Sequence, residues 1–419
     1  MRKHYLDNIR WFSVLAVVLY HVFFMFNNIS VMAFRTFSDV QYQDGIIYLL
    51  YPWIMVILFL IAGMSSRYYL EKHTIKEFIS SRTRKLLVPS TIGILLFGWT
   101  QGYISMMETD AFTNSPEIMS LPLPARILIM DVSGTSILWF SQMLWLISML
   151  AALIAKLEKG RLYKFTSKAG IITSVLLVIP VFVSANILNM PILSVYRFGL
   201  YPFVFFLGYF VFAHDEVIER IAKFRIPLII ASVLLVIPVF VSANILNLPI
   251  LSVYRFGLYP FVFFLGYFVF AHDEVIERIA KFKIPLLVTA AALGIAYMVL
   301  YFGQDAMSEP TMTSIPAVAF CWAMCLALLG SFRAWFNVQT PLASFMTKRS
   351  FGIYTFHYLC MSAVALVLVR HTNCPAVPTY ILCGIAGLGG AIILTEIVTR
   401  IPFVRWCLLG IKKTAKKEA

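Results

Sequence analysis

Two ionisable side chains in the first apolar segment are spaced so that they could act together. Arg10 and His21 stand eleven residues apart in the segment IRWFSVLAVVLYHVFF. In an α-helix, eleven residues make three turns plus about 20° and rise about 16 Å, so both side chains lie on one face. A histidine inside a membrane is costly, and its imidazole is suited to moving protons. The pair therefore predicts a functional site.

The composition places these residues in a membrane protein. Hydrophobic residues make up 60% of the 419 residues, charged residues make up 13%, and the mean hydropathy is +0.84. A soluble domain of this length could not bury so much apolar surface. The first apolar segment has no small-residue cleavage site after its core, so we expect it to remain as a span rather than to be removed as a signal peptide.

Apolar runs of about 17 to 22 residues predict twelve membrane-spanning helices. They cover roughly residues 11–32, 46–65, 87–106, 137–155, 171–189, 198–213, 229–247, 256–271, 285–302, 314–332, 351–369 and 379–398. With a cytoplasmic amino terminus, 29 of the 34 Lys and Arg residues fall in segments predicted to face the cytoplasm. This bias predicts an all-α, polytopic membrane protein with both termini cytoplasmic. The net charge of +14 is then explained by the orientation of the protein in the membrane and by attraction to anionic lipid. No nucleic-acid partner is expected.

The chain contains a direct tandem repeat. Residues 171–228 recur as residues 229–286, and 55 of the 58 positions are identical. Each copy is predicted to contain two spans and a cytoplasmic amphipathic tail, HDEVIERIAKF, so the later spans keep their orientation. We predict a single membrane domain over residues 1–419, with a core of ten spans and one extra two-span hairpin. Either copy could occupy the original place.

Five motifs, each in or beside one of the predicted spans, carry a resemblance to a known family when they are taken together. They are YLDNIRWFSVLAVVLYH, FLIAGMSSRYYL, SSRTRKLLVP, ILWFSQMLW and SFGIYTFHYL. Together they resemble membrane-bound acyltransferase family 3, which includes O-acetyltransferases of surface polysaccharides and the succinyltransferase of periplasmic glucans. Its most specific element is an Arg and a His separated by ten residues in the first helix, which Arg10 and His21 match. The resemblance implies a cytoplasmic acyl-CoA donor, acetyl-CoA foremost, and an acceptor hydroxyl on the far side.

Acyl transfer from a thioester to a hydroxyl needs a group that removes the hydroxyl proton as the oxygen attacks. A neutral imidazole, with an ordinary pKa of about 6.5, can do this at physiological pH, so His21 is the expected general base. His21 could instead be a nucleophile that forms an acyl-imidazole, or make a structural hydrogen bond to a neighbouring helix. Arg10 is expected to orient CoA or to gate its pantetheine arm, because guanidinium groups suit phosphates. The alternative is an Arg that snorkels at a helix end.

A basic segment before the third span supplies further candidates for CoA binding. Arg82 and Lys85 match the cytoplasmic Arg-x-x-Arg element of the family, with Lys in place of the second Arg. Lys keeps the charge but loses the bidentate geometry, so Arg84 is an alternative phosphate contact. A basic loop that faces anionic lipid is the other interpretation of this segment.

Ser350, Tyr354 and His357 follow one another at spacings of four and three, which places them along one face of the eleventh span. We expect this face to bind substrate, to adjust the basicity of His21 or to stabilise the oxyanion; a structural role between helices is the alternative.

Trp139 matches the Trp of the family's Trp-Phe pair and is a further substrate-binding candidate, although interfacial aromatic residues usually anchor helices. Glu108, Asp110 and Asp131, in the longest outer loop, are candidate contacts for the acceptor, although acidic residues of loops are usually only solvated.

The sequence has no zinc-ligand spacing and no Gly-x-Ser-x-Gly motif, so no metal is expected. The chain ends soon after its last predicted span, so no soluble fused domain is expected.

We predict a multi-pass protein of a cell membrane, which is most naturally the bacterial plasma membrane. Membrane lipid would surround it. It would transfer an acetyl or other short acyl group to an extracytoplasmic carbohydrate or related cell-envelope acceptor. The main alternative is a transporter or exporter of a glycan or glycolipid, with its histidines in a proton relay.

Overall fold

The computed structural model describes the chain over residues 3–29, 34–108, 116–133, 138–158, 161–186 and 254–412. The chain divides into two compact units, of which the first comprises residues 1–178 and 262–419 and the second residues 179–261. Each unit is considered by itself, and the first carries every candidate site residue. The described residues form helices and no β-strand, which confirms the all-α prediction for this part of the chain.

Helices of very different lengths build the first unit. They are α1 (His4–Phe24), α2 (Gly45–Leu70), α3 (Ile75–Arg82), α4 (Ile94–Glu108), α6 (Pro116–Ser120), α7 (Leu123–Ser133), α8 (Trp139–Glu158), α9 (Arg161–Thr166), α10 (Ile171–Leu176), α16 (Asp273–Lys281), α17 (Lys283–Tyr301), α18 (Glu309–Met312), α19 (Ile315–Trp335), α20 (Pro341–His371), α21 (Ala376–Ile385), α22 (Ala391–Arg400) and α23 (Pro402–Leu409). Two helices that cross the unit boundary are α11 (Val178–Asn186) and α15 (Tyr254–Leu265). The described residues also include a 3-10 turn, η1 (Tyr42–Asp44), and the π-helical turns η2 (Thr83–Leu87), η3 (Pro89–Gly93), η11 (Gly266–Phe270) and η12 (Ala386–Gly390).

Seven spans are long and apolar enough to cross a membrane within the described residues, which supports a membrane protein. They are His4–Phe24, Tyr42–Leu70, Trp139–Leu157, Lys283–Tyr301, Ile315–Trp335, Pro341–His371 and Ala376–Arg400. The bent pair Leu258–Phe270 and Asp273–Lys281 makes an eighth if it is counted as one span. The predicted spans 198–213 and 229–247 and the candidate residue Asp110 lie outside the described residues.

Two spans show the largest differences from the bounds that the apolar runs predict. α1 ends at Phe24 rather than near residue 32, where the Asn27 side-chain amide donates to the Phe24 carbonyl and the chain turns. α20 begins at Pro341 rather than at residue 351, because the Thr340 hydroxyl caps the helix before the apolar run starts. His21 therefore lies one turn from the end of α1, whereas His357 lies near the middle of α20.

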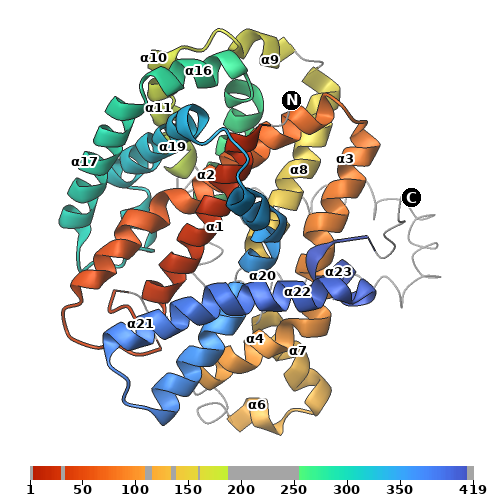
Figure 1. The fold of residues 1–419 in the computed structure, drawn as a ribbon, viewed down its shortest axis with the longest axis vertical. Coiled ribbons are helices and arrows are strands. Elements are labelled where there is room, and N and C mark those ends of the chain that lie inside the picture. The colour runs from red at the N-terminus through yellow and green to blue at the C-terminus, as the bar shows by residue number, and fades with distance from the viewer. Residues whose placement is uncertain are drawn as a thin grey trace, which may run out of the picture. The chain divides into compact units, whose positions relative to one another are not determined.

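The helix α1, red in Figure 1, packs against α2, α19 and α20 and so joins the elements of the site. α2 in turn packs tightly against the segment that leads into η11. A Cβ atom on Gly63 would lie 1.9 Å from the Phe263 carbonyl oxygen, and one on Gly266 would lie 1.9 Å from the Leu60 carbonyl oxygen. Such reciprocal glycines let membrane helices approach closely. The second copy of the repeat thereby contributes residues to the core of the first unit.

Candidate functional site

His21 of α1 and His357 of α20 meet directly. Nε2 of His357 lies 3.1 Å from Nδ1 of His21, and the two ring centroids are 5.0 Å apart. Nδ1 of His357 lies 2.9 Å from the Tyr354 carbonyl oxygen and 3.1 Å from that of Ile353. Because carbonyl oxygens only accept hydrogen bonds, Nδ1 of a neutral His357 carries the proton and its Nε2 accepts. His21 therefore donates from Nδ1, to His357 and to the Val17 carbonyl oxygen 2.9 Å away.

This hydrogen-bond pattern selects one tautomer of neutral His21. Its proton sits on Nδ1 and its lone pair on Nε2, and Nε2 has no hydrogen-bond partner in the described part of the chain. An imidazole nitrogen with a free lone pair is the form that accepts a proton. His357 acts as the partner that orients it.

Aromatic rings surround the histidine pair. Edge-on or tilted ring contacts, with centroids 4.9 to 6.2 Å apart, are made by Tyr20, Phe24, Tyr354 and Tyr358. His357 is buried, whereas His21 is half-buried. Charge that develops there would be stabilised or penalised more strongly than in bulk water.

The residues predicted to bind CoA line one cavity of about 740 Å³. Its lining includes Arg10, Arg82, Arg84 and Lys85, together with Ser350 and Tyr354 of α20. The histidines do not line it. The cavity reaches Tyr354, whose ring centroid lies 6.2 Å from that of His357.

This cation cluster carries more positive charge than the described side chains neutralise. Asp7, 2.9 Å from Arg10, is its one acidic partner in the ion pairs of the described residues. Nε of Arg84 is buried and has no hydrogen-bond partner there. Burial and the neighbouring Arg10 lower the pKa of Arg82 to about 10, and burial and the nearby arginines lower the pKa of Lys85. Such a cluster favours a ligand with several negative charges, such as phosphate groups.

The end of α2 holds two of these guanidinium groups. The Ser65 hydroxyl accepts from Arg10 at 3.2 Å, and the Ser66 hydroxyl accepts from Arg82 at 2.9 Å. These serines fix the directions of the guanidinium groups, so whatever anchors this end of α2 also positions the cluster.

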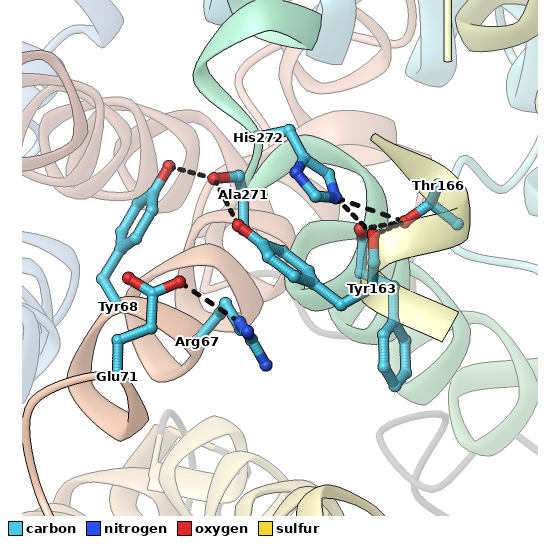
Figure 2. A network of polar contacts seen from close by, with 8 residues as sticks. Arg67, Tyr68, Glu71, Tyr163, Thr166, Ala271 and His272 are labelled. Carbon is cyan, nitrogen blue, oxygen red and sulfur yellow. Dashed lines mark hydrogen bonds and ion pairs between the residues drawn. The ribbon is translucent and has the colours of Figure 1, made fainter. Parts of the chain in front are cut away.

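A polar network that the sequence did not reveal anchors this end of α2, as Figure 2 shows. The Tyr68 and Tyr163 hydroxyls donate to the Ala271 carbonyl oxygen at 2.7 and 3.4 Å. Ala271 lies at the 95° bend before α16, where a backbone carbonyl lacks a helical partner and must find another. His272 donates from Nε2 to the Tyr163 carbonyl oxygen at 2.7 Å and stacks on the Tyr163 ring. The Arg67 guanidinium lies 3.7 Å from the centroid of the same ring.

The tandem repeat offers a matched test of this network. We expect His272→Ala to lower the free energy of unfolding by about 1–3 kcal/mol, because the Tyr163 carbonyl loses its buried donor. The thermal unfolding midpoint of the detergent-solubilised protein measures the change. His214 is the same residue of the first copy, and His214→Ala should leave the midpoint unaltered. A larger loss from His214→Ala would show that the first copy occupies this place instead.

Two other predicted residues lie away from the cation cluster. Trp139 does not line the cavity; its neighbour Phe140 does, with its ring centroid 5.7 Å from that of Tyr354. Glu108 lies at the end of α4 remote from η2, close enough to Tyr358 for an electrostatic interaction. Since Tyr358 contacts His21 with ring centroids 5.1 Å apart, Glu108 is linked to the histidine pair through one aromatic ring.

Comparison with known proteins identifies one family. The model of acyltransferase family 3, described as an acyltransferase domain, matches residues 3–243 and again residues 219–396. The two matches together cover most of the chain, and they overlap inside the duplicated region. No curated protein and no solved structure matches the chain.

Proposed function

Because the chain belongs to acyltransferase family 3, we propose that it moves an acetyl or other short acyl group from acyl-CoA to a hydroxyl of an extracytoplasmic carbohydrate or related cell-envelope acceptor. Family membership makes it an acyltransferase with membrane-spanning helices. The observation that supports the finer proposal is a cation-lined cavity that reaches Tyr354, whose ring contacts a histidine pair with one unprotonated nitrogen free. The membrane is then a cell membrane, with the cation cluster at its cytoplasmic face.

The cation cluster is proposed to bind the phosphates of CoA. CoA carries a diphosphate and a 3′-phosphate, and planar guanidinium groups match phosphate oxygens better than an ammonium group does. Arg10 and Arg82 are held in place by serine hydroxyls, and the buried Nε of Arg84 needs an acceptor. Ser350 and Tyr354 line the same cavity, and we assign them to the pantetheine arm, which leads the thioester towards the histidines.

In the proposed chemistry, the acceptor hydroxyl gives its proton to Nε2 of His21 as its oxygen bonds to the thioester carbonyl carbon. His357 stabilises the resulting imidazolium, because its Nε2 accepts the Nδ1 hydrogen bond of His21. The carbon–sulfur bond then breaks, and His21 returns the proton to the leaving thiolate. The products are an ester and the CoA thiol. Glu108, on the side of the pair away from the cations, is assigned to the acceptor.

Inverted membrane vesicles test this function, because they expose the cytoplasmic face to added acetyl-CoA. We expect free CoA thiol to appear together with label on an acceptor in the vesicle, and vesicles without the protein should show neither. If a glycan crosses the membrane while no thioester is consumed, the chain is an exporter and the proposal is wrong.

A further inference from the structure

A second cavity, of about 280 Å³ and almost entirely apolar, lies among α4, α20, α22 and α23. Its walls include Phe97, Leu138, Phe356, Leu394 and Val404. Neither its apolar lining nor its place is explained by the binding of CoA phosphates. It also reaches Tyr358, the residue whose ring contacts His21.

The two cavities therefore approach the histidine pair through two tyrosines. The cation-lined cavity includes Tyr354, beside His357, and the apolar cavity includes Tyr358, beside His21. Tyr354 and Tyr358 are one helical turn apart on α20. A thioester at the histidine pair would have its CoA part in one cavity and its acyl part within reach of the other.

Hydrogen-bond donors gather at the Tyr358 end of the apolar cavity. Gln101 is 7% exposed and lines the cavity; its Oε1 accepts from the Ser362 hydroxyl at 3.4 Å, but its buried Nε2 has no acceptor among the described residues. Tyr358 lies one turn before Ser362 on the same face of α20. A buried amide donor left without an acceptor costs about 1–3 kcal/mol, so this end suits a ligand with an oxygen acceptor.

The opposite end of the cavity is apolar and lies on the side of the cation cluster. It is bounded by Gly93 and Leu408, next to Leu409 of the cation-lined cavity. The eight residues from Gly93 to Gln101 correspond to about 12 Å along the helix. A membrane phospholipid has the reverse order, because its polar headgroup lies at the surface and its terminal methyl groups lie deep. An acyl group whose carbonyl is at the histidine pair has the order that fits.

We propose that this cavity, the acyl-chain pocket, holds the hydrocarbon chain of the transferred acyl group, with the Gln101 amide near its carbonyl oxygen. The proposal rests on acyl-CoA being the donor, and it narrows the substrate to acyl groups with several methylenes rather than acetyl alone. The Gln101 amide and the Tyr358 hydroxyl would donate to the oxygen that becomes negative when the acceptor attacks.

A series of donors from acetyl-CoA to decanoyl-CoA, with the purified full-length protein in proteoliposomes, tests the pocket. For the parent protein we expect kcat/KM to rise by a factor of about four for each methylene that is buried, until the pocket is full. Leu394 lines the pocket, and Leu394→Phe should lower kcat/KM for the longer donors about tenfold more than it lowers kcat/KM for acetyl-CoA. Its neighbour Ile393 is 62% exposed and outside the pocket, so Ile393→Phe is the matched control and should leave the profile unaltered.

Gln101→Met tests the placement of the carbonyl oxygen. It removes the amide donor at similar size, so kcat should fall by about 10²-fold equally for every chain length. The thermal unfolding midpoint reports whether each variant is folded. An unchanged kcat in a folded Gln101→Met variant would overturn this placement.

The outcomes separate the pocket from the proposed function. If the parent consumes acetyl-CoA fastest and Leu394→Phe leaves the chain-length profile unaltered, the pocket inference is wrong while the function stands. If a folded Leu394→Phe variant slows all donors equally, the cavity serves packing or lipid, and the inference is again wrong. If no thioester of any length is consumed, the proposed function fails and the pocket fails with it.

Discussion

His21→Asn is expected to slow acyl transfer about a thousandfold, which is the contribution of a well-placed general base. The Asn amide can replace the Nδ1–H donor that binds the Val17 carbonyl and His357, but it offers no nitrogen in place of Nε2. The fold should therefore survive while the base is lost. Because the cation cluster is separate from the histidine pair, KM for acyl-CoA should change little. The release of free CoA thiol in proteoliposomes, followed at several acyl-CoA concentrations, measures both the rate of acyl transfer and KM.

His371→Asn is the control for this substitution. His371 ends α20, the helix that also carries His357, and it is exposed. We expect full activity from this variant. If His21→Asn at equal abundance transfers at the parent rate, His21 is not the base. Label that stays on the parent protein when the acceptor is withheld, and is absent from His21→Asn, would assign His21 as the nucleophile.

Arg82→Met is expected to have two opposite effects. KM for acyl-CoA should rise about 10- to 100-fold, because hydrogen bonds to a charged partner contribute about 1.5–3 kcal/mol. The unliganded protein should become more stable, because burial and the neighbouring Arg10 lower the pKa of Arg82 to about 10. A lowered pKa of a cation means that the folded state disfavours its charged form, so removing the charge relieves a cost at neutral pH.

Thermal unfolding with and without CoA measures both effects of this substitution. The parent midpoint should rise when CoA is added, and Arg82→Met should start higher and rise less. Arg161→Met is the control, because Arg161 is an exposed residue of α9 outside the cavity. A lower starting midpoint for Arg82→Met would contradict the electrostatic cost, and an unchanged KM would contradict the role in phosphate binding.

Helix positions could be predicted from apolar runs, but helix ends could not. A run of apolar residues indicates the length of chain that can be buried in lipid or protein. The end of a helix depends instead on single hydrogen bonds. Asn27 ends α1 and Thr340 starts α20 through side-chain contacts with the backbone. The π-helical turns at residues 83–87 and 89–93 likewise cannot be predicted from hydropathy. They lie where the third predicted span begins, and helical backbone at Val88 and Ile94 carries the chain through them into α4.

The candidate site was predictable where its residues share one helix. The spacing of Arg10 and His21, and that of Ser350, Tyr354 and His357, follows from helical geometry. Contacts between distant segments gave no such signal.

The distance between His21 and His357, and the pairing of Tyr163 with His272, depend on how helices pack. The register of α8 also places Phe140 in the cavity wall instead of Trp139. A family motif contains both residues of the pair, but only the packing of the helix determines which of them lines the cavity.

The aromatic rings around the histidine pair also matter for the membrane's electrochemical gradient. Charged groups and imidazoles that follow one another through a membrane would leak protons if a continuous file of water joined them. On the cavity side, the rings of Phe59, Phe140 and Tyr354 contact one another in sequence, with centroids 4.8 and 5.7 Å apart. On the other side, the Tyr20 ring stacks on those of Phe24 and Tyr51. We expect these stacked rings to prevent a continuous file of water from forming. An acyl group could then be transferred across the membrane without leakage of protons.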